Sequence, residues 1–176
     1  MNFTVRVAIY AVCFCTAGAA QDQRILTPHG LGPVSTGMTL AEAQTALGTK
    51  LEHLNLMEGC NYAVQNGDPG VGIFYDIEGD RIVAIEIEPA RNTSREPSIS
   101  TAAGIRLGSP VADVRKGYGA LLRTQKPSIR RSWIVNELVV DGPEPGRGIV
   151  FEMDGEKVVG MRAGLYPKLR SASDCD

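Results

Sequence analysis

The chain has 176 residues, a formal net charge of −2 and 43% hydrophobic residues. This ordinary composition excludes a disordered chain, a coiled coil and a collagen-like repeat. The slight excess of acidic residues argues against a protein that binds nucleic acid through bulk positive charge.

Residues 1–20 predict a secretory signal peptide. Arg6 supplies the positively charged start, an apolar stretch follows at 7–16, and small residues precede Gln21. The apolar stretch is shorter than the roughly 20 residues that a membrane-spanning helix needs. We therefore predict cleavage near Gln21 and a mature protein, without a membrane span, that is periplasmic or secreted.

Two cysteines, Cys60 and Cys175, remain after the predicted cleavage. In an oxidising compartment such a pair is typical of a disulfide bond, which would tie the C-terminal tail to the first half of the chain. Two free thiols are the alternative. A zinc site is not expected, because only His29 and His53 could add ligands, and we expect no cofactor.

Matching segments indicate an internal repeat. Residues 37–48 and 108–119 each have a glycine at both ends and apolar residues at the spacing of one helix face. Segments 73–85 and 149–161 align without gaps, and each has the pattern of a strand, a glycine turn and a second strand.

Capping signals bound both predicted helices. Thr39 and Glu42 form a capping box in the first half, and Ser109, which precedes a proline, is the expected N-cap in the second. Gly48 and Gly119 suit left-handed C-terminal caps. Helices this short are not stable alone in water, so each must pack on another element.

The alternation of apolar residues predicts the loop of each hairpin. Alternate residues of 73–77 and of 83–87 share one face only if the connecting loop has an odd number of residues. We therefore predict a three-residue loop with Gly79 left-handed in a bulge, and the same arrangement at Gly155.

These elements together predict an α+β fold with two tandem pseudo-repeats. Each is expected to be a short helix, or helix pair, packed on an antiparallel β-sheet of about three to four strands. Further strands are expected over 61–64 and 132–140, and the two sheets should lie side by side or share an edge. The predicted division is a signal peptide at 1–20, a first repeat at 21–90, a linker at 91–100 and a second repeat with the C-terminal tail at 101–176.

The first helical segment, from Gly37 through Thr39 and Glu42 to Gly48, resembles the repeat opening of the beta-lactamase-inhibitor-protein-like fold. Outer-membrane assembly lipoproteins of the BamE (small protein A) type look similar over one repeat, and the inhibitor proteins carry two in tandem. The chain also resembles uncharacterised exported bacterial proteins in the pattern of residues 101–119. The resemblance implies a scaffold that binds other proteins through its sheet and loops, without chemistry of its own.

No nucleophile elbow, phosphate-binding loop or zinc-protease motif occurs in the sequence, so we expect no enzymatic activity. Six basic residues and no acidic one lie between Arg115 and Arg131. One interpretation is a charged face that aids solubility. The functional interpretation is a partner surface, since arginine and tryptophan are enriched in binding hot spots. Its candidate residues are Arg123, Lys126, Arg130, Arg131, Trp133 and Tyr62.

The sequence thus predicts an exported, non-enzymatic protein-binding module of the bacterial envelope, of the inhibitor or assembly-factor type. Its expected partner is an envelope or extracellular protein, and neither nucleic acid nor a membrane span is expected. The alternative is a periplasmic carrier of a small anionic ligand bound between the two repeats by Arg123, Arg130 or Arg131. A closed apolar pocket with an inward-facing arginine would favour the carrier, whereas an exposed sheet with aromatic residues would favour protein binding.

Overall fold

The structure is a computed structural model that describes residues 24–57, 60–65, 71–90, 98–127 and 133–170. Several predictions fall outside these ranges. They are the signal peptide at 1–20 with cleavage near Gln21, most of the linker at 91–100, and the residues Arg130, Arg131 and Cys175.

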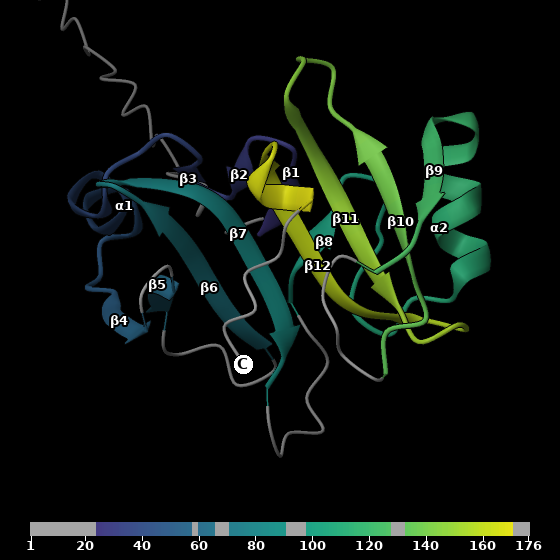
Figure 1. Cartoon of the computed structure of the whole chain (residues 1–176), viewed down its shortest axis with the longest axis horizontal. Coiled ribbons are helices and arrows are strands. Elements are labelled where there is room, and N and C mark those ends of the chain that lie inside the picture. The colour runs from purple at the N-terminus through teal and green to yellow at the C-terminus, as the bar shows by residue number, and fades with distance from the viewer. Residues whose placement is uncertain (1–23, 58–59, 66–70, 91–97, 128–132, 171–176) are drawn as a thin grey trace, which may run out of the picture.

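Eight antiparallel strands form one large sheet in the spatial order β4-β5-β6-β7-β12-β11-β10-β9 (Figure 1). Each half of the chain contributes four neighbouring strands to it. The first half supplies β4 (Glu52–Met57), β5 (Cys60–Gln65), β6 (Val71–Glu78) and β7 (Arg81–Pro89). The second half supplies β9 (Leu122–Gln125), β10 (Asn136–Asp141), β11 (Arg147–Met153) and β12 (Val158–Leu165).

A smaller sheet and two helices complete the described fold. The sheet has the order β3-β2-β1-β8, in which β1 and β8 are parallel. Its strands are β1 (Ile25–Thr27), β2 (Gly30–Leu31), β3 (Val34–Ser35) and β8 (Ser100–Thr101). The helical segments are α1 (Leu40–Leu47), α2 (Val111–Tyr118), and the short 3-10 turns η1 (Gly119–Leu121) and η2 (Lys168–Arg170).

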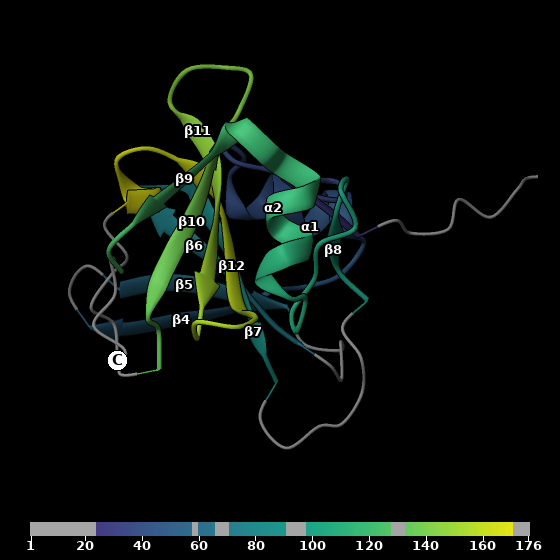
Figure 2. The ribbon, with the colours of Figure 1, turned by 90° about the vertical axis from the view of Figure 1, so that its right-hand side faces the viewer.

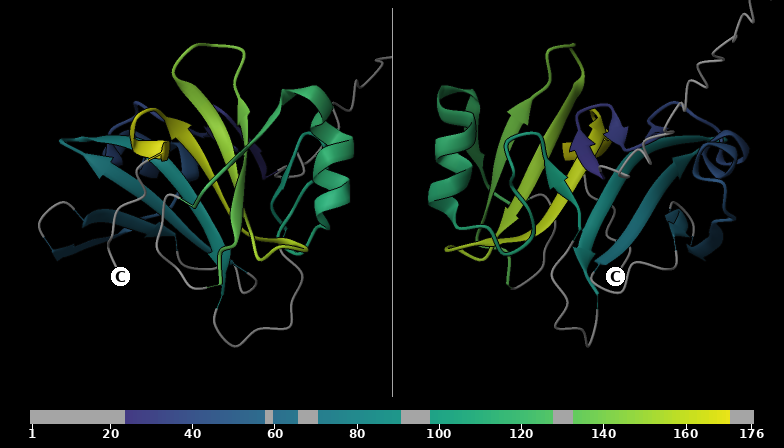
Figure 3. Two further views of the ribbon diagram at one scale, coloured as in Figure 1. Left: turned by 45° about the vertical axis from the view of Figure 1, so that its right-hand side comes forward. Right: turned by 180° about the vertical axis from the view of Figure 1, so that it is seen from behind.

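The large sheet separates two unequal layers. Both helices lie on one side of it, and η2 lies on the other (Figure 2). Seen from behind, the small sheet lies between the two helices (Figure 3). The main hydrophobic core fills the helix side, where Ala43 of α1 and Val114 of α2 are fully buried against sheet residues such as Tyr75 and Phe151. We call the opposite side the η2 side.

The predicted α+β fold class is wrong, because the structure is mostly β. The described residues contain twelve strands and only two α-helices, of eight residues each. Capping glycines end both helices after about two turns, so neither can form a full layer. The four strands of each half meet at an edge, one of the two arrangements that we predicted, because β7 pairs with β12, and together they form one continuous sheet. Residues 25–35, for which we predicted no element, form most of the second sheet.

Helix α1 confirms its predicted caps, whereas Gly119 ends α2 with a positive φ of 51° but a ψ of −123°, outside the predicted left-handed helical conformation. Thr39 accepts a hydrogen bond from the Glu42 backbone and Glu42 reaches back to Thr39, while Gly48 is left-handed with φ of 66°. The second N-cap is Pro110 rather than Ser109. The Ser109 hydroxyl instead accepts a hydrogen bond from the Arg106 backbone, which draws it away from the helix end.

The β6–β7 loop has two residues rather than the predicted three. Glu78 pairs directly with Arg81, and Gly79 between them is left-handed as predicted, with φ of 64°. The register shifts beside Asp76, where Val83 is an additional residue in β7. The extra residue that the apolar pattern requires therefore lies in the strand as a bulge, and not in the turn.

The second hairpin has the same bulge with a longer loop. Residues 154–157 connect β11 to β12, so the three-residue prediction is wrong here too, although Gly155 has a positive φ of 106°. The register shifts beside Glu152, where Val159 is the additional residue. Both hairpins thus change face close to the turn, after two paired residues in the first and one in the second, which keeps the apolar residues of each hairpin on the core side.

Close backbone contact at the β7–β12 seam gives a first prediction. A Cβ atom on Gly164 would lie 2.4 Å from the backbone oxygen of Val83, so the two strands would have to move apart. Gly164→Ala should therefore lower the free energy of unfolding by about 1–3 kcal/mol. Urea unfolding of both proteins measures this. An unchanged midpoint would show that the seam is not packed as described.

Candidate functional site

Arg123, one of the predicted partner-surface residues, lies in β9 on the η2 side. Its Cα partner in β10 is Val139, which packs against Leu169 of η2. The guanidinium binds Asp141 in a two-point ion pair, with Nη2–Oδ1 at 2.6 Å and Nε–Oδ2 at 3.0 Å. The hydroxyl of Tyr166 also donates to Asp141. Arg123 is therefore exposed but held in one orientation.

Three large apolar side chains are exposed beside the edge strand β9, one at its start and two beyond its far end. Leu121 is 66% exposed, Trp133 is 57% exposed and Val135 is 61% exposed. Leu121 precedes β9, while the other two lie just before β10, beyond the far end of β9. Lys126 is exposed directly after β9. We call the group Leu121, Arg123, Lys126, Trp133 and Val135 the β9-end surface.

An open strand edge borders the β9-end surface. Within the part of the chain that the structure describes, β9 pairs with β10 alone and is the last strand of the large sheet. Such an edge carries unpaired backbone N–H and C=O groups, with which another chain can pair. Our prediction missed Leu121 and Val135, because a single aliphatic residue in a sequence gives no sign of its exposure.

Other predicted site residues lie elsewhere. Tyr62 is in β5, near the opposite end of the sheet from β9; it is only 6% exposed, and its ring packs edge-on against Phe74. We therefore leave Tyr62 out of the β9-end surface. Arg130 and Arg131 lie outside the described residues, as does the predicted disulfide bond between Cys60 and Cys175.

A buried ion network occupies the η2 side of the sheet, and our sequence analysis did not predict it. Arg162 of β12 is 2% exposed, and its Nη2 atom donates to Glu137 of β10 at 2.7 Å. Its Nε atom lies 2.9 Å from a carboxylate oxygen of Glu152, at an angle that makes an ion pair but no hydrogen bond. Gln125 donates a further hydrogen bond to Glu137.

Two further carboxyl groups lie beside this network. Glu86 is the Cα partner of Arg162, and burial raises its pKa to about 7, although the charge of Arg162 opposes the shift. Burial also raises the pKa of Asp76, and Lys168, 3.3 Å away, only partly offsets this rise. Strongly shifted carboxyl groups are a recognised sign of functional sites, so this cluster is a candidate site in its own right.

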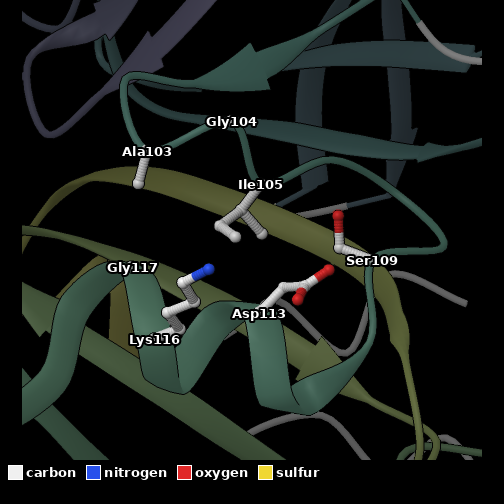
Figure 4. A pocket seen from close by; sticks show the side chains of 7 residues that line it. All are labelled: Ala103, Gly104, Ile105, Ser109, Asp113, Lys116 and Gly117. Carbon is white, nitrogen blue, oxygen red and sulfur yellow. The ribbon is translucent and has the colours of Figure 1, made fainter.

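A hollow of about 320 Å³ opens between α2 and the loop before it. Figure 4 shows Asp113 and Lys116 pointing into it from the helix, with Ile105 on the facing wall. A carboxylate and an ammonium group three residues apart offer no net charge for an anion to bind. The hollow is also formed by the second half alone, so it is not a cleft between the two halves.

Within the described ranges, no three side chains of His, Cys, Asp or Glu come together in a way that could hold a metal ion. The helices there are all too short or too polar to cross a membrane. No known protein family matches the chain, and neither the curated proteins nor the solved structures include a similar one. A functional proposal must therefore rest on the geometry described above.

Proposed function

We propose that this protein is an exported, non-enzymatic protein-binding module that contacts its partner through the β9-end surface. The observation that carries the proposal is the exposure of three apolar side chains, Leu121, Trp133 and Val135, beside an open sheet edge. Exposed tryptophan and arginine side chains on one edge are the composition expected of a binding surface with hot spots.

The charges near this surface indicate the chemistry of the partner. Lys126 is exposed, and Arg115 and Lys116 lie exposed on the neighbouring helix α2. Arg123 is already neutralised by Asp141. An acidic partner segment with an apolar side chain to contact Trp133 would match this distribution, and the positive charges would mainly increase its rate of association.

The carrier alternative receives less support. Arg162 is an inward-facing arginine, but Glu137 and Glu152 already bind it, and an incoming anion would meet both carboxylates. The seam between the halves is a continuous backbone ladder with Gly164 packed against Val83. A ligand therefore has no room at that seam.

The proposal predicts that Trp133→Ala weakens partner binding by at least about 30-fold, as expected for a hot-spot residue worth about 2 kcal/mol. Lys126→Glu should slow association and reduce its dependence on salt. The measurement is capture from envelope extract by the immobilised chain, followed by binding kinetics with the captured protein.

Lys50→Glu is the matched control, because Lys50 is exposed beside β4 at the opposite end of the sheet. It should bind like the unchanged chain. Equal binding by Trp133→Ala and the unchanged chain would refute the β9-end surface as the contact site.

A further inference from the structure

The C-terminal strap, residues 166–170, crosses the η2 side of the sheet. The Tyr166 backbone N–H donates to the Gly146 oxygen at 2.8 Å, where the strap leaves β12. Leu169 is 1% exposed and packs on Val139 and Val150. These contacts place the apolar side chain of Leu169 over strands β10 and β11.

Polar contacts hold the same strap to both halves of the sheet. Arg162 Nη1 donates to the Leu169 carbonyl oxygen at 3.2 Å. Lys168 Nζ lies 3.3 Å from Asp76 and 3.8 Å from Glu78, both on β6. Because β7 and β12 lie between β6 and β11, the strap passes over the seam.

Glu86 of β7 lies on this covered side of the seam. It is the Cα partner of Arg162 on β12 and of Phe74 on β6, and η2 contacts β7 directly. Glu86 is 8% exposed, and no group in the described part of the chain makes a hydrogen bond or an ion pair with it. A buried carboxyl without such partners strongly favours its neutral form.

The charge of Arg162 favours ionisation of Glu86, whereas the charges of Asp76, Glu152 and Glu88 oppose it. The groups that act on it or lie close by come from every neighbouring element: Asp76 and Glu78 on β6, Glu88 on β7, Glu137 on β10, Glu152 on β11, Arg162 on β12 and Lys168 on η2. Among the described residues, Glu86 shares this region with the buried acids Asp76, Glu137 and Glu152, and Arg162 and Lys168 are cations that contact them.

We propose that the C-terminal strap lifts from the sheet when Glu86 ionises and returns when Glu86 is protonated. Lifting lets water reach the carboxylate, which removes the desolvation penalty at the cost of the Leu169 contacts. Glu86 therefore binds its proton less tightly when the strap is lifted than when the strap covers it. By linkage, protonation of Glu86 favours the covered position of the strap. Since burial raises the pKa of Glu86 to about 7, the transition falls near neutral pH.

Lifting would uncover Val139 and Val150 beside the β9-end surface. Both side chains are fully buried only while Leu169 covers them. The strap is thus a pH-dependent cover for an apolar patch on the η2 side. This inference does not depend on the proposed partner surface, because it concerns only contacts within the chain.

Methyl NMR of the full chain tests the proposal. Between pH 5.5 and 8.5, nuclear Overhauser contacts from Leu169 to Val139 and Val150 should lose at least about half their intensity, with a midpoint near 7. Contacts between Ile73 and Ile87 in the core should persist, which separates lifting of the strap from global unfolding.

Variants make the test specific. Glu86→Gln should keep the Leu169 contacts at pH 8.5 as strong as at pH 5.5, while Glu156→Gln, at an exposed hairpin turn, should behave like the unchanged chain. Lys168→Met, which removes the tether to Asp76, should show weaker contacts at every pH. Contacts that do not change with pH in the unchanged chain, or that weaken equally in Glu86→Gln, would overturn the proposal.

Discussion

Replacing Arg162 with methionine is expected to lower the free energy of unfolding by about 3–5 kcal/mol. The guanidinium is almost fully buried, and its nitrogen atoms lie within 3 Å of Glu137 and Glu152. Methionine fills most of the volume but removes from both buried carboxylates the cation that Arg162 supplies. Uncompensated buried charge, rather than lost packing, produces the large cost. Urea unfolding at pH 7 measures it.

A matched control separates burial from ion pairing itself. Arg123 makes an equally close ion pair with Asp141, but both side chains are about half exposed. Arg123→Met should therefore cost less than about 1 kcal/mol. Adding Glu137→Gln and Glu152→Gln to Arg162→Met should recover much of the lost stability, because the buried charges are then gone. Similar small losses for Arg162→Met and Arg123→Met would contradict the described burial.

Glu86→Gln is expected to remove a decline in stability that the unchanged chain shows as pH rises from about 5 to 8. Burial raises the pKa of Glu86 from 4.5 to about 7. Between these values the folded protein holds a proton that the unfolded chain has released, so rising pH favours unfolding. The decline reaches about 3 kcal/mol if the whole shift is expressed.

The comparison of the two proteins at two pH values isolates this residue. At pH 5 the buried group is neutral in both proteins, and Glu86→Gln should be less stable by about 1 kcal/mol, the cost of burying an amide without partners. At pH 8 the unchanged chain has lost the stability linked to the proton of Glu86, so the variant should be more stable by about 1–2 kcal/mol. Titrating groups that do not interact with Glu86 affect both proteins equally. A difference that does not change with pH would show that Glu86 has an ordinary pKa.

Local elements of this fold could be predicted where the cause is itself local. The capping box of Thr39 and Glu42 and the left-handed Gly48 depend on residues within one helix, and all three are confirmed. The strand predicted at 61–64 lies within β5. Ser109 failed as a cap because Arg106, in the preceding loop, competes for its hydroxyl. The predicted loop lengths of the hairpins are wrong because the alternation of apolar residues requires one additional residue but does not show whether it lies in the loop or in a strand.

The candidate sites show a similar division. The basic segment and Trp133 could be identified because the sequence shows residue type and charge directly. It does not show which side chains are buried. Tyr62 and Trp133 looked alike as candidates, yet one is buried against Phe74 and the other is 57% exposed. The ion network around Arg162 gave no signal, because its members come from separate strands.

The sequence alone determined the composition class, the caps of α1, the glycine turns and the alternation of apolar residues in the hairpins. Each follows from interactions between residues close together in the chain. Only the tertiary structure decided that β7 pairs with β12, that the strands of both halves form one sheet, and that Glu86 lies buried beside Arg162. These features depend on contacts between segments that are distant in the sequence, and no local pattern shows which segments will meet. The energy of a buried charge depends on the same contacts, because they remove it from water.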